Sequence, residues 1–176
     1  ASANMGYSLL PLLTQGGIDA MGHYGTPEQK ATYLENLISG KWSGTMNLTE
    51  PQAGSDAAAV ATMAEDKGDH YLMNGQKTFI TNGGISDVYT VFAITTPGAG
   101  TKGMSAFIVE ASFPGVTCGK PEKKMGIRGS HTTDIFFEDV KVPKENLLGE
   151  EGKGFKVAMQ ALDRTRPAIA AMAVGA

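Results

Sequence analysis

The hydrophobic pattern of this chain changes its period twice, and that change constrains the fold more than any single motif. Apolar residues follow helical spacing up to about residue 40, form short β-branched and aromatic runs over residues 43–142, and return to helical spacing from Phe155. About eight short runs separated by turn residues, with no helical pattern between them, predict a barrel or a sandwich. We therefore expect an α+β fold in which helical pieces flank a β domain.

The expected strands can be placed by their residue ranges. They cover residues 43–48, 57–64, 70–73, 76–81, 88–95, 104–110, 116–118 and 135–142. Asn74-Gly75 separates two of these runs and is the strongest short hairpin signal in the chain.

The clearest helix signal begins at Thr26. Thr26 is an N-cap residue, Pro27 follows in the first turn, and Gln29 completes a capping box, while Gly40 is a typical helix end. These residues predict a helix over about 27–39.

Two further helical regions contain residues that break helices. Before residue 24 we expect helix pieces interrupted by Pro11 and by Gly16-Gly17. After Phe155 we expect a helix that Pro167 either kinks or restarts, continuing to the last residue.

Composition excludes several classes of function. The net charge of −3 argues against nucleic acid or an anionic membrane surface as the main partner, and no apolar run is long enough to span a membrane. The single cysteine, Cys118, fits a reducing compartment and is expected to be a plain structural residue. The three histidines show no metal-ligand spacing, so no metal site is predicted. No initiator methionine is present, and both ends look cut from a longer protein.

The residues most suited to bind a ligand are 46–56, which read Met-Asn-Leu-Thr-Glu-Pro-Gln-Ala-Gly-Ser-Asp. Thr49 offers a hydroxyl close to Pro51, and small residues around Gly54 expose backbone N–H groups. Such a segment suits a phosphate or a flat ring. It also suits a plain surface turn, which is the more common outcome for these residues alone.

Three other clusters are weaker. Residues 78–84 end a strand with an aromatic residue, a hydroxyl and two glycines, which suits the edge of a planar cofactor or a core residue and a turn. Residues 163–166 place charges in an apolar helix, where they need a solvated face or an anionic ligand. Residues 125–130 form a glycine-flanked turn with one arginine, which we expect to be structural. No nucleophile–base pair, P-loop or Rossmann glycine pattern is present.

Taken in order, these segments resemble the acyl-CoA dehydrogenase family, a family of flavoproteins. The resemblance is carried by Thr49–Asp56, Asn74–Lys77, Phe79–Gly83, Phe107–Val109, Lys124–Arg128, Phe137–Pro143, Gly154–Lys156 and Leu162–Pro167. It covers essentially the whole chain, and the ordered set is highly specific although no single motif is decisive.

The resemblance implies a domain organisation and a reaction. Residues 1–42 would end an N-terminal helical domain, 43–150 would form the middle β-barrel domain, and 151–176 would begin a C-terminal helical bundle. The family binds FAD and oxidises an acyl-CoA thioester to a trans-2-enoyl-CoA, as in fatty acid β-oxidation, and an electron-transfer flavoprotein reoxidises the flavin. A homo-oligomer, either tetramer or dimer, is expected, in the cytoplasm if the protein is bacterial and in the mitochondrial matrix if it is eukaryotic.

The resemblance also assigns site residues. The cofactor-binding set would be Met46, Leu48, Thr49, Gly54, Ser55, Phe79, Ile80 and Thr81. Thr49 would meet the pyrimidine edge of the flavin, Phe79 would cover the ring, and Thr81 would lie near N5. The substrate-binding set would be Ser55, Thr101, Asp163 and Arg166, with Ser55 near the FAD pyrophosphate and the CoA chain; Arg166 could instead act only as a structural partner of Asp163.

Two departures and one absence stand out. The family more often has glycine at Gln52 and commonly has tryptophan at Phe79, which keeps the stacking surface but loses the N–H. The family's catalytic glutamate is expected beyond residue 176, so this chain alone should not turn over substrate. Alternatives on the same fold are an acyl-CoA oxidase or a flavin monooxygenase, and from another class a non-catalytic β-barrel binding module.

Overall fold

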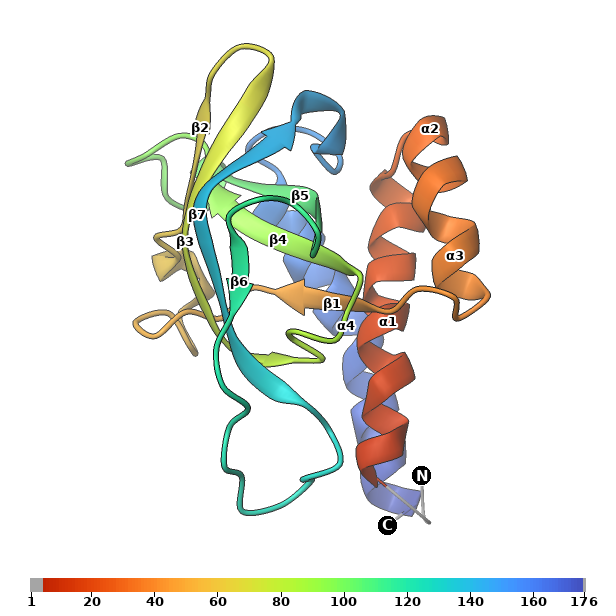
Figure 1. Ribbon diagram of the computed structural model, residues 1–176. Helices are drawn as coiled ribbons and strands as arrows, with labels where there is room; N and C mark the ends of the chain where they lie inside the picture. Colours follow the sequence, from red (N-terminus) through yellow and green to blue (C-terminus); the bar gives the residue numbers. More distant parts are fainter. Residues whose placement is uncertain (1–4, 176) are drawn as a thin grey trace.

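The computed structural model describes residues 5–175, with side chains described from residue 11 onward. A strongly curved sheet packs against two long helices, α1 (Met5–Tyr24) and α4 (Gly154–Gly175), which run antiparallel beside each other (Figure 1). The α+β class predicted from the change of period is confirmed. No helix in residues 5–175 has the length and apolar character needed to cross a membrane.

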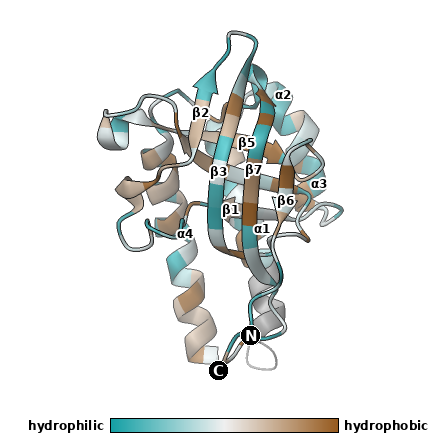
Figure 2. Cartoon of the chain, turned by 60° about the vertical axis from the view of Figure 1, so that its left-hand side comes forward, coloured by the Kyte–Doolittle hydropathy of each residue, from teal (hydrophilic) through white to brown (hydrophobic). Residues whose placement is uncertain are grey.

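The sheet has seven strands in the order β1-β4-β2-β3-β7-β6, and β5 pairs with β4. The strands are β1 (Gly44–Asn47), β2 (Met63–Asp66), β3 (His70–Thr81), β4 (Val88–Ile94), β5 (Met104–Glu110), β6 (Val116–Cys118) and β7 (Thr132–Pro143). β1 lies parallel to β4, β2 meets β4 at one parallel pair, and the remaining pairs are antiparallel. Figure 2 shows the apolar middle of β7 and the polar tip of the β2–β3 hairpin.

Two hydrophobic cores lie on opposite faces of the sheet. Phe92 and Ile108 point toward the helices, where they join Met21 and Val157. The alternate residues of β4 and β5, such as Phe107, point into the hollow of the curved sheet. Both faces of these central strands are therefore buried, which explains why their sequences are apolar at almost every position.

The helix predicted over 27–39 is present as one helical segment. It consists of α2 (Pro27–Gln29), the π-helical η1 (Lys30–Leu34) and α3 (Glu35–Ile38). The capping box is confirmed, because Gln29 N donates to Thr26 Oγ1 at 3.2 Å and Thr26 N donates to Gln29 Oε1 at 3.0 Å. Gly40 follows the helix with a φ of +72°, as a helix-ending glycine should.

The predicted breaks in the first helix are wrong. α1 continues through Pro11 and through Gly16-Gly17. Gly16 and Gly17 are buried, and a Cβ on Gly16 would lie 3.6 Å from Thr165 Cγ2 of α4. Packing against α4 and the sheet holds the helix together where local propensity would not. α4 continues through Pro167, so of the two expected outcomes Pro167 does not start a new helix.

The hairpin predicted at Asn74-Gly75 is also wrong. β3 runs without interruption from His70 to Thr81, and the turn that joins β2 to β3 lies around Gly68. Gly75 instead occupies a register shift between β3 and β7, at a φ of +153°. A Cβ there would lie 2.5 Å from Thr62 Oγ1, so the glycine is required by a neighbouring chain segment rather than by a turn.

The strand predicted over 57–64 begins later than expected. Ala57–Ala59 form a 3₁₀ turn, η2, because the Asp56 carboxylate accepts the N–H of Ala58 at 3.1 Å. Further 3₁₀ turns are η3 (Gly100–Gly103) and η4 (Lys144–Asn146).

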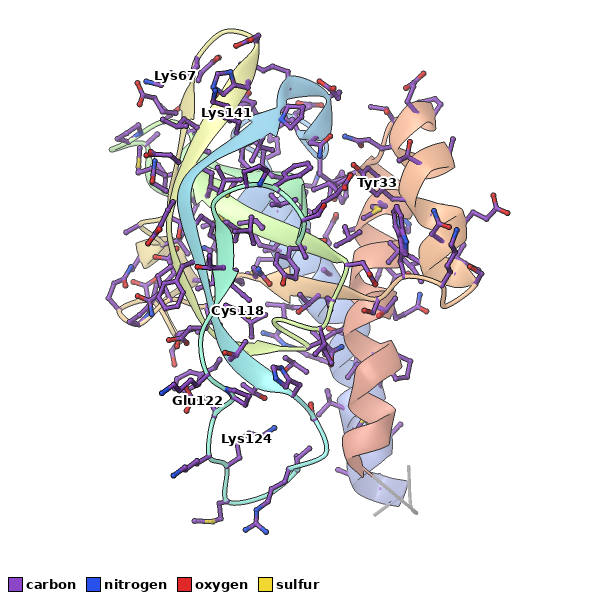
Figure 3. All side chains as sticks on the ribbon, in the orientation of Figure 1. Tyr33, Lys67, Cys118, Glu122, Lys124 and Lys141 are labelled. Atoms are coloured by element: carbon purple, nitrogen blue, oxygen red, sulfur yellow. The ribbon has the colours of Figure 1, made fainter. Side chains whose placement is uncertain are left out.

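The glycine-flanked turn with one arginine lies in the long loop between β6 and β7. Glu122 and Lys124 mark this loop where it extends from the sheet (Figure 3). Arg128 donates to the carbonyls of Lys124 and Met125, both at 3.2 Å. The arginine therefore braces its own loop, as expected of a structural turn.

Candidate functional site

The segment after β1 lies directly beside a bulge in β3. Thr78 N donates to Thr49 O at 2.9 Å, which joins the two segments through their main chains. Glu50 and Ala53 exchange main-chain hydrogen bonds of 3.2 and 3.0 Å, so the chain turns sharply after Thr49. The structure thus brings together the 46–56 segment and the 78–84 cluster, which the sequence placed some 30 residues apart.

The bulge presents Phe79 to the outside. The register between β3 and β7 shifts between Lys77 and Ile80, and Phe79 has a φ of +54°, a conformation that costs a non-glycine residue energy. Its side chain is 64% exposed. Thr78, beside it, is fixed by a 2.6 Å hydrogen bond from its hydroxyl to Asp134 Oδ1. A large aromatic side chain is therefore held away from both cores on a rigid support.

Polar groups without partners lie on the same two joined segments as this aromatic side chain. Within residues 5–175, the hydroxyls of Thr49, Ser55 and Thr81 make no hydrogen bond, and neither do the N–H groups of Gly54 and Ser55. Gly54 faces open space, since a Cβ there would meet nothing within 4 Å. Donors beside an exposed aromatic face suit a planar ring with carbonyl edges and a phosphate group, so these residues fit FAD, the cofactor that the resemblance implies.

Leu48 and Ile80 contribute differently from the other predicted cofactor residues. They are 8% and 3% exposed, and their side chains belong to the two hydrophobic cores. Only their main-chain atoms remain for a ligand. Met46 is half-buried and lines an apolar cavity of about 160 Å³. The other lining residues of this cavity are Leu12, Leu13, Gly16, Leu162, Thr165 and Ile169.

This cavity between α1, β1 and α4 was not predicted from the sequence. The sequence feature that could have indicated this cavity is the glycine pair at 16–17. We interpreted this pair as a helix break, but it lies where α1 meets α4 and the sheet.

The predicted substrate residues lie in three parts of the structure, namely the loop that holds Ser55, the 3₁₀ turn η3 and the helix α4. Thr101 is on η3, which contacts η2 just after Ser55, so these two residues border the same region. Asp163 and Arg166 lie on α4 and are exposed, with 3.7 Å between Asp163 Oδ1 and Arg166 Nη1. No hydrogen bond or ion pair joins them to the 46–56 segment among the described residues. They are, however, one residue away from Leu162 and Thr165 of the apolar cavity.

A buried ion pair under the 46–56 segment was also missed. Lys77 and Glu50 have side chains 0% and 2% exposed, and 2.7 Å separates Lys77 Nζ from Glu50 Oε1. Burial lowers the pKa of Lys77 to about 8, against the opposing effect of Glu50. Burial alone would raise the pKa of Glu50, but the Lys77 charge and hydrogen bonds keep it below its ordinary value. The sequence feature that could have indicated this ion pair was a lysine at an inward-facing position of a strand.

The sequence profile of the acyl-CoA dehydrogenase middle domain matches residues 45–140. A short-chain specific acyl-CoA dehydrogenase of Clostridium acetobutylicum is 52% identical over 155 residues, covering 88% of this chain and 41% of that relative. The solved butyryl-CoA dehydrogenase of Megasphaera elsdenii superposes with a TM-score of 0.97 at 46% identity, covering 99% of this chain and 46% of that one.

A structure described as the electron transferring flavoprotein of Acidaminococcus fermentans matches with a TM-score of 0.88 at 51% identity, covering 90% of this chain and 42% of that one. The chain thus spans less than half the length of each of these proteins.

Proposed function

Since the chain belongs to the acyl-CoA dehydrogenase family, we propose that the full-length protein oxidises an acyl-CoA thioester to a trans-2-enoyl-CoA with FAD, and that this chain supplies the flavin-facing β domain. The observation that carries the proposal is the junction of the Thr49 segment with the bulge that exposes Phe79. It joins the segment that carries the unpartnered donors to the strand that carries the exposed aromatic side chain.

Bound FAD supplies a hydride acceptor for the β-hydrogen of the substrate. The Thr49 hydroxyl and the neighbouring main chain would donate to the pyrimidine edge of the flavin, and Thr81 would donate near N5. Such donors stabilise negative charge as it develops on the ring. Phe79 would cover the ring and exclude water, while the N–H groups of Gly54 and Ser55 would hold the pyrophosphate.

The apolar cavity beside Met46 would receive the acyl chain. Its described lining has almost no polar surface, and Met46 is the residue that it shares with the flavin-facing segment. An apolar pocket ending at the flavin segment is what the α,β-oxidation of an acyl chain requires. Thr101, Asp163 and Arg166 would border the path of the CoA moiety.

The proton-abstracting carboxylate would come from a part of the full-length protein outside this chain. We also propose that the protein works as a homo-oligomer and passes its electrons to an electron-transfer flavoprotein, a partner suggested by the similar Acidaminococcus fermentans structure.

The test is a dye-linked dehydrogenation assay with a panel of CoA esters. The full-length protein should oxidise at least one ester, whereas the 176-residue chain alone should be inactive. Turnover by the isolated chain at the rate of the full-length protein would contradict the proposal that the proton-abstracting carboxylate lies outside this chain. Rapid reoxidation of the reduced enzyme by air, faster than by electron-transfer flavoprotein, would instead identify an oxidase.

A further inference from the structure

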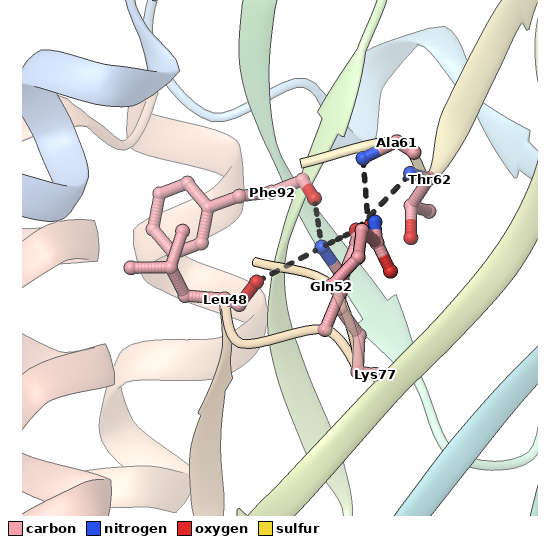
Figure 4. Close-up of polar contacts among 7 residues, drawn as sticks. Leu48, Gln52, Ala61, Thr62, Lys77 and Phe92 are labelled. Carbon is pink, nitrogen blue, oxygen red and sulfur yellow. Dashed lines mark hydrogen bonds and ion pairs between the residues drawn. The ribbon is translucent and has the colours of Figure 1, made fainter. Parts of the chain in front are cut away.

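The Lys77 ammonium makes three hydrogen bonds, which equals its number of donors. Lys77 Nζ lies 2.7 Å from Glu50 Oε1, 2.6 Å from Phe92 O and 3.3 Å from Leu48 O (Figure 4). These acceptors come from two segments, since Leu48 and Glu50 follow β1 and Phe92 lies on β4, and Lys77 itself is on a third segment, β3. One side chain therefore ties three parts of the sheet together from inside.

The Glu50 carboxylate organises the loop that follows. Its Oε1 accepts Lys77 Nζ and the N–H of Thr62 at 3.0 Å. Its Oε2 accepts the N–H of Ala61 at 2.7 Å and Gln52 Nε2 at 2.6 Å. Four donors thus surround one buried carboxylate, and the hydrogen bonds join the two ends of the 50–62 loop to it (Figure 4).

A buried ion pair is a poor means of stabilising a fold. Removing two charges from water costs so much that an apolar pair of similar size often stabilises a protein as well or better. An apolar pair, however, cannot hold two main-chain carbonyls and two main-chain N–H groups in fixed positions. The Lys77–Glu50 pair does hold them, which points to a role in geometry.

The residues held in place are neighbours of the flavin-facing groups. Thr49 lies between Leu48 and Glu50, so both its flanking residues are bound to the pair. Thr78 follows Lys77 directly, and its N–H donates to Thr49 O at 2.9 Å. Phe79, with its left-handed backbone, is next along β3. A shift at Lys77 would therefore move Thr49 and Phe79 together.

We propose that Lys77, through its buried pair with Glu50, is a positioning residue that sets the geometry of Thr49 and Phe79 toward the flavin ring. The proposal rests on the function proposed above and adds a residue that would never touch the cofactor. Its effect on FAD would pass through the main chain of residues 48–50 and 77–79.

The experiment uses three variants of the full-length protein. Lys77→Met removes the charge and keeps the length of the side chain. Lys77→Met with Glu50→Gln also removes the partner charge, so that no unpaired ion stays buried. Val140→Ala is the control, because Val140 is fully buried in the core inside the curved sheet and makes no hydrogen bond to the 46–62 segment. Thermal unfolding, FAD dissociation constants of the apoproteins and amide hydrogen exchange are measured for each.

We expect Lys77→Met to raise the FAD dissociation constant about tenfold or more, as expected when charged hydrogen bonds that fix a binding loop are lost. The amides of Ala61 and Thr62 should exchange faster in the same variant. The double variant should regain thermal stability without regaining FAD affinity. Val140→Ala should lower the melting temperature and leave the FAD affinity unchanged.

The proposal is overturned if the double variant binds FAD as tightly as the wild type, or if Lys77→Met and Val140→Ala weaken FAD binding equally for an equal loss of melting temperature. A wild-type protein that binds no FAD would refute the proposed function instead. Even then, unchanged exchange at Ala61 and Thr62 in Lys77→Met would refute the positioning role, because that measurement needs no cofactor.

Discussion

Replacing Gly75 by alanine tests whether a distant contact, rather than a turn, requires this glycine. Gly75 has a φ of +153°, and an added Cβ would lie 2.5 Å from Thr62 Oγ1 and 2.8 Å from Thr62 Cα. Gly68 provides a matched control, because it has a φ of +98° but its Cβ would meet nothing within 4 Å. Both substitutions impose backbone strain, and only the one at Gly75 adds a steric collision.

The magnitudes follow from these two terms. A left-handed or similarly rare backbone conformation costs a non-glycine residue about 1–2 kcal/mol, which is all that Gly68→Ala should lose. Forcing one extra methyl group into a packed contact adds about 1–3 kcal/mol, so Gly75→Ala should lose about 2–5 kcal/mol. Thr62 cannot move away from the added methyl group by itself, because its N–H donates to Glu50 Oε1 at 3.0 Å.

Urea denaturation followed by circular dichroism gives the free energy of unfolding of both variants in the full-length protein. Gly75→Ala should be the less stable by at least about 1 kcal/mol, and its apoprotein should bind FAD more weakly because Glu50 is disturbed. Equal losses in the two variants would show that backbone strain alone matters at Gly75. A gain in stability at Gly75 would refute the described packing altogether.

Three further predictions concern the site and its support. Phe79→Ala should raise the FAD dissociation constant about tenfold, the effect of losing one aromatic stacking surface, and should leave the melting temperature unchanged because the ring is 64% exposed. Tyr33→Phe should cost about 1 kcal/mol of unfolding free energy through loss of the 3.0 Å bond to Glu110, with FAD binding unaffected in a fluorescence titration. The pKa of Glu50 is lowered in the folded protein, so this carboxylate stabilises the fold at pH values above its ordinary pKa of 4.5, and the stabilisation is lost on further acidification. Calorimetry at a series of pH values should show a smaller loss of stability on acidification when Lys77→Met and Glu50→Gln are combined.

Local chemistry made parts of the fold predictable. The capping box at Thr26 and Gln29 needs only four residues, and it forms as the sequence indicates. The β-branched and aromatic run that becomes β4 is buried on both faces, which agrees with its almost continuous apolar sequence.

The wrong predictions share one physical cause. Pro11 and the pair Gly16-Gly17 are weak helix formers, but α1 packs against α4 and the sheet, and tertiary packing outweighs propensity. Asn74-Gly75 is a strong turn signal, yet Gly75 is needed where Thr62 approaches and Asn74 Nδ2 donates to Asp139 Oδ1 at 3.0 Å. Neither contact can be inferred from residues close in sequence.

The candidate site was also predictable only in part from the sequence. Thr49 and Phe79 could be proposed from their motifs, since such residues have a recognisable order along the chain. Their contact through Thr78 depends on the pairing of distant segments, and the Lys77–Glu50 pair joins residues 27 positions apart. A lysine in a strand gives little indication that its ammonium will be completely buried.

The central prediction is that the Thr49 segment and Phe79 form one wall of a flavin site. The most direct measurement is the visible absorption spectrum of the purified full-length protein, recorded anaerobically before and after addition of CoA esters. We predict flavin absorption bands that bleach when a suitable acyl-CoA is added. A colourless protein that does not take up FAD, or a bound flavin that no acyl-CoA ester bleaches, would contradict the account.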